Sequence, residues 1–308
     1  MKISVIGVGK VGSTIAFALS QRNCVREIVM VGRSQQRTLG DALDIAHAQC
    51  FVEVPTRVIA GDLQDTANSS VIVMCASIPM PDKMEDRSVL GQDNVKLMQQ
   101  LFPPLAKLSP DAIILMVSNP VDMLTYYAIE FTGFPWQRVV GTGTLIDSIR
   151  LRHELSLEVG IHNQDLRAYV LGEHGGSQFA ALSCATAGGE PIDDTPARRE
   201  LATKVARSGL NILHVKGYTN YGIALAAVKI VEAIVRDTQQ IMPVSVAIDN
   251  YLGVNNVCLS LPVVLGRNGV ERILHPELNE EEARAFRKCA ATVQAQILHA
   301  RQALPPQP

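Results

Sequence analysis

The sequence predicts an α/β fold, with a doubly wound parallel sheet in its first half and an α+β arrangement in its second half. Short β-branched runs alternate with helical patterns over residues 1–142, as expected for parallel strands joined by crossover helices. Longer helices dominate from residue 143 onward. The chain of 308 residues is about twice a typical domain length, so we expect two domains, 1–142 and 143–308.

The first half contains six runs that are mostly apolar, as strands covered by helices on both faces should be. We therefore expect one sheet of six strands, at residues 3–6, 28–31, 57–60, 71–75, 113–117 and 139–140. After the first run, Val11, Ile15 and Leu19 recur at helical spacing, and residues 88–108 form a second helical pattern.

The second half is predicted to contain long helices at residues 144–157, 198–213 and 218–237. Asn268-Gly269 is a typical hairpin turn between two strands. Asn279 is followed three residues later by Glu282, which is the pattern of a capping box. A final helix should therefore begin at this point.

The composition restricts the kind of partner. With 28 Lys and Arg against 30 Asp and Glu, the net charge is −2, and no long basic run suggests binding to nucleic acid or an anionic membrane. The longest strongly apolar stretches are far shorter than the roughly 20 residues of a membrane helix. A strand predicted from residue 2 leaves no room for a targeting peptide, so we expect a cytoplasmic protein. Its six cysteines show no metal or redox spacing and are expected to be buried thiols.

A glycine-rich loop follows the first predicted strand and opens the first helix. It contains Gly7, Gly9 and Gly12, with Lys10 and Val11 between the last two. Glycines permit a tight turn and a close approach of the backbone, and the free N–H groups of the following helix attract a pyrophosphate. In this context the loop predicts a dinucleotide-binding domain of the Rossmann type. The alternative is a glycine turn without a ligand.

The end of the second strand bears on the choice of cofactor. An NAD-binding domain normally has Asp or Glu there, which binds the adenosine ribose hydroxyls. This chain has Gly32, followed by Arg33 and Ser34, whose guanidinium and hydroxyl suit a 2′-phosphate. We therefore expect NADP in preference to NAD. The alternative is that Arg33 is a solvated loop residue and both cofactors are used.

Three further segments carry side chains suited to acid–base chemistry. Asp147 and Arg150 are three residues apart on a predicted helix, and so share one of its faces. His174 follows an apolar strand and is flanked by glycines, and Asn119 ends the fifth strand, where open α/β sheets bind their ligands. Taken singly, these residues are equally consistent with a surface ion pair, a structural histidine and a helix cap.

Together and in this order, these segments resemble the L-lactate and malate dehydrogenase family, and the resemblance spans nearly the whole chain. Further matching stretches are residues 40–44, 141–144, 216–219 and 261–269. The resemblance implies an NAD(P)-dependent oxidoreductase that transfers a hydride reversibly between nicotinamide and C2 of an L-2-hydroxy acid. The second half would then be the α+β catalytic and substrate domain.

The resemblance also implies a role for individual residues. His174 matches the histidine that exchanges a proton with the substrate oxygen, and Asp147 matches the carboxylate that holds the imidazole. Arg150 matches the guanidinium that grips the substrate carboxylate. Arg87 matches the arginine that polarises the carbonyl, and Asn119 would bind near the same oxygen.

Other positions follow from the same resemblance. Thr219 is assigned to the substrate pocket, and Asn94, Ser118 and Asn119 are assigned to the cofactor site. Members of the family are dimers or tetramers, in which helices such as residues 41–48 usually lie at the interface. We therefore expect a homo-oligomer with a small 2-keto or 2-hydroxy acid as substrate, and no metal.

The loop before Arg87 departs from the family. Six residues before this arginine, lactate enzymes have Gln and malate enzymes have Arg, whereas this chain has Pro81, or Met80 if one residue is inserted. An apolar side chain there favours a substrate without a second carboxylate, lactate-like or larger. The alternatives are a malate dehydrogenase that uses Lys83 in this loop, or a loop in which another residue faces the substrate.

Two other functional classes are less consistent with the sequence. A non-catalytic nucleotide-binding member of the family has no chemical need to retain His174, Asp147, Arg150 and Arg87 together. An NAD-dependent glycosidase would need a metal site, for which the sequence offers no convincing cluster. Both are therefore less favoured than a dehydrogenase.

Overall fold

The computed structural model describes the backbone of residues 1–79 and 87–304, and their side chains except those of 87–90. The strands of the first half form a parallel sheet. They are β1 (Lys2–Ile6), β2 (Glu27–Val31), β3 (Arg57–Ala60), β4 (Val71–Met74), β5 (Ile113–Met116) and β6 (Val139–Gly141). Each predicted strand is confirmed, with its ends within one residue of those expected.

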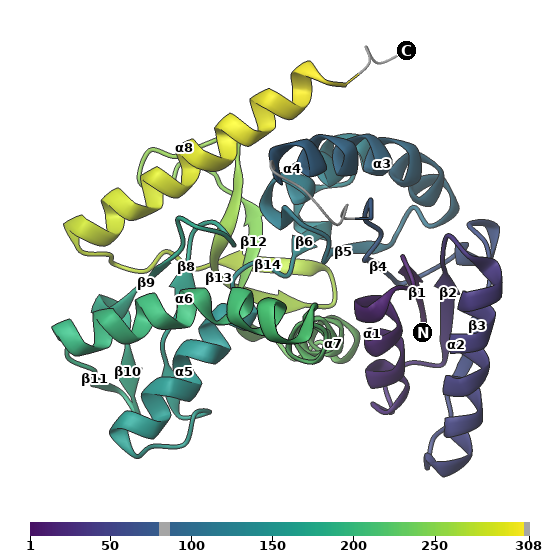
Figure 1. Ribbon diagram of the computed structural model, residues 1–308, viewed down its shortest axis with the longest axis horizontal. Coiled ribbons are helices and arrows are strands. Elements are labelled where there is room, and N and C mark those ends of the chain that lie inside the picture. The colour runs from purple at the N-terminus through teal and green to yellow at the C-terminus, as the bar shows by residue number, and fades with distance from the viewer. Residues whose placement is uncertain (80–86, 305–308) are drawn as a thin grey trace.

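The prediction that these six strands form the whole sheet is wrong. Three antiparallel strands from the second half extend it: β12 (Gln240–Ala247), β13 (Cys258–Gly266) and β14 (Gly269–Ile273). The resulting order is β14-β13-β12-β6-β5-β4-β1-β2-β3 (Figure 1). The addition covers β6, which would otherwise be an exposed edge strand. The backbones approach closely there, since a Cβ on Gly141 would lie 2.8 Å from the Cβ of Ser245.

Helices cover the sheet and connect its strands. They are α1 (Lys10–Ser20), α2 (Gln35–Ala48), α3 (Arg87–Leu108), α4 (Val121–Thr132), α5 (Leu145–Val159), α6 (Pro196–Lys216), α7 (Tyr221–Arg236) and α8 (Glu280–Gln302). The long helix α8 packs against α3 and α4, and α7 packs against α1, so elements of the second half lie directly on those of the first (Figure 1). The capping box is confirmed, with Asn279 and Glu282 bonded to each other's main chain.

Two small sheets complete the second half. Their strands are β7 (Leu166–Arg167), β8 (Val170–Leu171), β9 (Phe179–Ala180), β10 (Thr186–Ala187) and β11 (Glu190–Pro191). β7, β10 and β11 form one sheet, and β8 pairs with β9 in the other. The turn expected at Asn268-Gly269 joins β13 to β14, and Gly269 has a φ of +94°, which favours glycine there.

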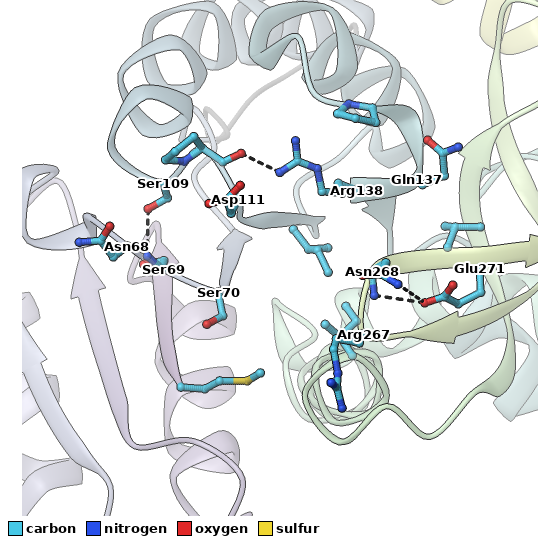
Figure 2. A pocket seen from close by; sticks show the side chains of 16 residues that line it. Asn68, Ser69, Ser70, Ser109, Asp111, Gln137, Arg138, Arg267, Asn268 and Glu271 are labelled. Atoms are coloured by element: carbon cyan, nitrogen blue, oxygen red, sulfur yellow. Dashed lines mark hydrogen bonds between the residues drawn. The ribbon is translucent and has the colours of Figure 1, made fainter.

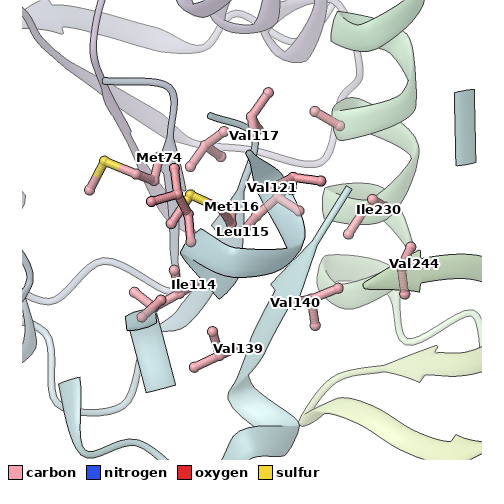
Figure 3. Close-up of a cluster of buried hydrophobic side chains, with 14 of the residues drawn as sticks. Met74, Ile114, Leu115, Met116, Val117, Val121, Val139, Val140, Ile230 and Val244 are labelled. Atoms are coloured by element: carbon pink, nitrogen blue, oxygen red, sulfur yellow. The ribbon is translucent and has the colours of Figure 1, made fainter. Parts of the chain in front are cut away.

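The core is continuous across the two halves. Figure 3 shows Met74 and Leu115 of the central strands together with Val121 of α4, Ile230 of α7 and Val244 of β12, all of them buried. A second, smaller cluster lies between α5, α6 and the small sheets. Helix α5 begins in the main cluster and continues into the second one, so its first turn is fixed between them.

Two of the predictions on composition have a structural outcome. Cys258 and Cys289 are buried as expected, but Cys50 is exposed and the other three cysteines are only partly covered, so the expectation of six buried thiols is wrong. None of the six is in a disulfide bond. In the part of the chain that the structure describes, no helix combines the length and apolar character needed to cross a membrane.

Candidate active site

The candidate site lies at the carboxyl edge of the parallel strands. The loops after β1, β4, β5 and β6 all emerge there, and α5 begins directly beyond β6. In open α/β sheets this edge is where ligands bind, because helix N-termini and loops converge on it. Gly7 and Gly9 are on the first of these loops, Ser118 and Asn119 are on the loop after β5, and Asp147 and Arg150 are in the first two turns of α5.

The glycine loop after β1 has the shape that its sequence predicts. Gly7 has a φ of +95°, and a Cβ there would lie 2.2 Å from the main-chain nitrogen of Ala76. A Cβ on Gly12 would lie 2.3 Å from the carbonyl oxygen of Gly7, so the helix packs closely on the loop. Gly9 faces open space and begins α1 without a side-chain cap. The free N–H groups of this helix are therefore accessible to a pyrophosphate.

At the end of β2, the structure shows why position 32 is glycine. A Cβ on Gly32 would lie 2.2 Å from the Oγ1 of Thr38, which reaches back from the first turn of α2. Thr38 is buried and donates this hydroxyl to the carbonyl oxygen of Ser34, at 2.9 Å. Ser34 is the N-cap of α2, and both Arg33 and Arg37 beside it are exposed. The sequence alone gave no sign of Thr38 or Arg37.

Two of the predicted cofactor residues hold loops in place. Asn94 is buried, accepts the N–H of Ile78 at 2.7 Å and donates to the carbonyl oxygen of Asn119 at 2.8 Å. Ser118 donates to the carbonyl oxygen of Ala76 at 2.6 Å. The two residues thus tie the loop after β4 to the loop after β5. Asn119 itself is exposed, and its Oδ1 accepts the N–H of Val121 at 3.3 Å.

The structure brings three of the predicted residues together around one carboxylate. Asp147, in the first turn of α5, accepts from the Nδ1 of His174 at 2.7 Å through its Oδ2. Its Oδ1 accepts from the Nη1 of Arg150 at 3.2 Å, one helical turn further on. Asp147 is 2% exposed, whereas the side chains of Arg150 and His174 are 21% and 26% exposed. Both cationic groups are therefore partly accessible, whereas the carboxylate between them is not.

Asp147 and His174 stabilise each other's charged form. Burial alone would lower the pKa of His174, but the charge and hydrogen bond of Asp147 outweigh it, so the pKa is raised. Burial acts to raise the pKa of Asp147, but His174 and Arg150 outweigh that effect and lower it. Asp147 is thus ionised and fixes the proton on the Nδ1 of the imidazole. The other ring nitrogen, Nε2, is left for a ligand.

The segment that carries His174 is held on both sides. Gly172 has a φ of +87°, and a Cβ there would lie 2.4 Å from the Sγ of Cys289 in α8. Glu173 accepts from the side chain and main chain of Ser177 and from the Nε2 of Gln296. The glycine and the glutamate that precede His174 therefore have structural reasons to be there.

Asp122 was not among the residues predicted from the sequence, although it binds the main chain of His174. This residue of α4 is 2% exposed, and its Oδ2 accepts the main-chain N–H of His174 at 2.7 Å. An Asp three residues after Asn119 has the pattern of an ordinary helix N-terminus, so local sequence gave no sign of a partner 52 residues away.

The junction between α6 and α7 contacts the first turn of α1. The Nζ of Lys10 lies 3.7 Å from the ring centre of Tyr218, and the Nδ2 of Asn220 donates to the Oγ1 of Thr14 at 3.0 Å. Thr219 lies between Tyr218 and Asn220 in the sequence and is partly buried. The predicted substrate residue is thereby flanked by two residues that contact α1.

Three predicted residues are not placed. Met80 and Pro81 lie outside the described residues, as does the side chain of Arg87, whose backbone begins α3. Their roles remain predictions from the sequence.

A separate cavity of about 760 Å³ lies at the opposite, amino edge of the parallel strands. Ser70, Asp111 and Arg138, which precede β4, β5 and β6, line it together with Arg267 and Glu271 of the β13–β14 hairpin (Figure 2). Two arginines and two carboxylates are among its lining residues, and the Asn268 amide already bonds Glu271. None of the predicted site residues lines this cavity.

Comparisons with known proteins agree across the chain. A family model described as lactate/malate dehydrogenase, NAD binding domain, matches residues 1–141. A second one, described as the alpha/beta C-terminal domain of the same enzymes, matches residues 144–303. L-lactate dehydrogenases of Clostridium botulinum strain 657 and Clostridium perfringens strain SM101 are each 37% identical to the chain. The first alignment covers 95% of this chain and 94% of the relative, and the second covers 96% of each.

Solved structures give the same result. The minor L-lactate dehydrogenase of Enterococcus mundtii, in a ligand-bound form, superposes with a TM-score of 0.92 at 29% identity. MGS-M5, a lactate dehydrogenase from a deep-sea metagenome library of the Medee basin, superposes with a TM-score of 0.93 at 30% identity. Each comparison covers 97% of this chain and 98% of the other.

Proposed function

Because this chain belongs to the lactate/malate dehydrogenase family and is an oxidoreductase, we propose that it reduces an apolar 2-keto acid to the L-2-hydroxy acid with NADPH, reversibly. The observation that carries this proposal is the cluster in which Asp147 holds His174 and Arg150 at 2.7 and 3.2 Å. Consumption of NADPH and keto acid in equal amounts, with the L-hydroxy acid as product, tests it.

The reaction requires a group that donates a proton in reduction and accepts it in oxidation, a clamp for the substrate carboxylate and a site that orients both. Keto acid, NADPH and one proton give hydroxy acid and NADP⁺; when bound, the reduced nicotinamide supplies the hydride to C2. The Nε2 of His174 holds the proton and releases it to the substrate oxygen, while Asp147 stabilises the imidazolium. Arg150 binds the substrate carboxylate in a planar fork, and Asn119 and Arg87 are proposed to bind the oxygen that gains charge.

The glycine loop supports binding of a dinucleotide in this position. Gly7, Gly9 and Gly12, with the main chain of Lys10 and Val11, would hold the pyrophosphate at the start of α1, whose first turn contains no acidic residue. Asn94 and Ser118 would act by shaping the loops beside it. A nicotinamide cofactor is expected for the family, and its NAD binding domain is the one that matches residues 1–141.

We propose NADP as the preferred cofactor on the chemistry of the α2 N-terminus. Thr38 occupies the space beside Gly32 that a carboxylate would need, and position 32 therefore has no acidic side chain to repel a 2′-phosphate. Arg33, Ser34 and Arg37 supply charge and hydroxyl at a helix N-terminus, which is a favourable environment for that phosphate.

Replacing Gly32 by Asp together with Thr38→Ala should reverse the preference from NADPH to NADH. The second change removes the hydroxyl that lies 2.2 Å from the new Cβ, and the new carboxylate repels the 2′-phosphate while accepting from the ribose. The NADPH-to-NADH ratio of kcat/KM should fall by one to two powers of ten, since a charged hydrogen bond contributes roughly 1.5–3 kcal/mol. Thr38→Ala alone is the control and should keep the preference. A wild type that uses NADH as efficiently as NADPH contradicts the proposal.

We propose a substrate without a second carboxylate. Met80 or Pro81 stands where malate enzymes of the family have an arginine, and the relatives compared above are named L-lactate dehydrogenases. Malate is thus less favoured, as is a non-catalytic role.

Met80→Arg and Pro81→Arg, made separately, should raise kcat/KM for oxaloacetate. Burial of its second carboxylate beside apolar groups without a cation is unfavourable, and a guanidinium supplies the missing partner. The more effective of the two substitutions identifies the residue that faces the substrate. Steady-state rates with pyruvate, oxaloacetate and longer 2-keto acids provide the measurement. A wild type that reduces oxaloacetate fastest would refute this and make Lys83 the first candidate for the contact.

Organisation and assembly remain proposals. We propose two domains, residues 1–142 and 143–308, with their boundary between β6 and α5. Strands from both domains belong to one sheet. We also propose a homo-oligomer, dimer or tetramer, in which α2 lies at an interface. Leu39 and Leu43, one turn apart on this helix, are about half exposed, which is unfavourable for a surface facing only water. The mass of the protein in solution tests this.

A further inference from the structure

The carboxylate of Asp122 is joined to the candidate base but takes no part in the chemistry described above. We propose that Asp122 is a positioning residue for His174: it fixes the main chain of the histidine and places a second negative charge near the imidazole. The 2.7 Å bond between the Oδ2 of Asp122 and the N–H of His174 is the contact that carries this inference. The inference rests on the proposed role of His174 as the acid–base group.

The carboxylate is kept in an environment that disfavours its charge. Asp122 is 2% exposed, and within the described residues its Oδ1 has no hydrogen-bond partner, nor does the Oγ of Ser245. Burial raises the pKa of Asp122 to about 6, an effect that the neighbouring hydroxyl of Ser245 and the bond to His174 only partly offset. A neutral amide at this place would avoid the desolvation of a charge, so stability alone does not explain the choice of aspartate.

Among the groups that the structure describes around Asp122, His174 is the cation that its charge acts on. The acidic groups near it are Glu173 and the thiols Cys258 of β13 and Cys289 of α8, and none of these compensates a carboxylate. His174 lowers the pKa of Asp122, and the charge of Asp122 raises the pKa of His174 in return.

Two charged groups of α5 also affect the pKa of His174. Asp147 raises the pKa of His174 through its charge and hydrogen bond, and Arg150 lowers it. Asp122 and Asp147 therefore both raise the pKa of His174, against the opposing effect of Arg150. Because Asp122 binds the main chain of His174, it does not occupy a nitrogen of the ring. Above about pH 6, where Asp122 is ionised, the imidazolium needed for keto-acid reduction is retained to a higher pH than it would be with Asp147 alone.

Asp122→Asn separates the charge from the hydrogen bond. The amide oxygen still accepts the N–H of His174, but the negative charge is gone. The alkaline limb of the kcat/KM profile for keto-acid reduction should move down by about half a pH unit or more, while the thermal midpoint at pH 8 stays at or above that of the wild type. Asp122→Ala also loses the hydrogen bond and should reduce kcat by a further factor of about ten or more.

Glu130→Gln is the matched control, because it removes a carboxylate from the same helix α4 at an exposed ion pair with Arg301. Its pH profile should coincide with that of the wild type. A profile of Asp122→Asn that also coincides with the wild type, while His174→Asn is inactive, overturns the Asp122 inference alone. A His174→Asn variant that stays active overturns this inference together with the proposed function.

If Asp122→Asn does not fold, a measurement on the wild type tests the coupling between Asp122 and His174. NMR titration of the His174 ring without substrate should give a pKa above the ordinary value, with a second inflection near pH 6 as Asp122 takes up its proton. A single inflection, or a pKa at or below the ordinary value, contradicts the proposed coupling.

Discussion

His174→Asn should reduce turnover by a factor of about 10²–10⁴ while leaving NADPH binding nearly unchanged. The imidazole bonded to Asp147 at 2.7 Å is the proposed proton donor, whereas the cofactor is held at the glycine loop after β1. Asparagine is similar in size but does not titrate in this range. Steady-state kinetics with a 2-keto acid and a direct measurement of NADPH affinity give the two quantities.

The pH profile provides a second test of the same residue. The raised pKa of His174 means that the imidazolium persists above its ordinary range, so reduction should slow as the pH rises through that value, and oxidation of the hydroxy acid should accelerate. His153→Asn, at an exposed histidine of the same helix as Asp147, is the control and should change neither rate nor profile. His174→Asn with more than about a tenth of the wild-type rate would remove His174 from its role.

Arg150→Lys should raise the KM for the keto acid about thirtyfold, with little change in the affinity for NADPH. Lysine keeps the charge but loses the planar fork, and the loss of a buried charged contact amounts to roughly 2 kcal/mol or more. In the structure, the Nη1 of Arg150 bonds Asp147, and the guanidinium packs against α6, where a Cβ on Gly209 would lie 3.3 Å from it.

The exposed Arg284 of α8 offers a matched control, since Arg284→Lys makes the same chemical change far along the chain in an exposed ion pair with Glu280. Its KM should equal that of the wild type. An unchanged KM in Arg150→Lys for the best substrate would show that Arg150 does not grip the carboxylate.

Local patterns predicted the parallel half of the fold well. The six strands were found because β-branched runs covered on both faces are continuously apolar, and the capping box at Asn279 depends only on residues three apart. The pairing of Asp147 and Arg150 follows from helical periodicity in the same way. These features share a short separation along the chain.

Features that depend on distant segments were not predictable from periodicity. The addition of β12 to β6 pairs Ser245 with Gly141, and nothing near either residue in the sequence indicates the other. Asp122 was not predicted for the same reason, since its partner His174 lies in the second half of the chain. The link between Asp147 and His174, 27 residues apart, came from family resemblance instead.

The end of β2 shows how structure refines a prediction. The absence of an acid at Gly32 was visible in the sequence, but the reason became clear only when α2 brought the hydroxyl of Thr38 into that space. We therefore expect that an aspartate at position 32 fits only when Thr38 is also replaced by alanine. The residue type at position 32 alone does not indicate this requirement.

The measurement that tests the central claim most directly is a steady-state comparison of pyruvate, oxaloacetate and longer 2-keto acids, each with NADPH and with NADH. The account predicts that each NADPH consumed yields one L-2-hydroxy acid, with an apolar monocarboxylic keto acid and NADPH as the most efficient pair. Binding of NADPH without oxidation by any of these acids would contradict it.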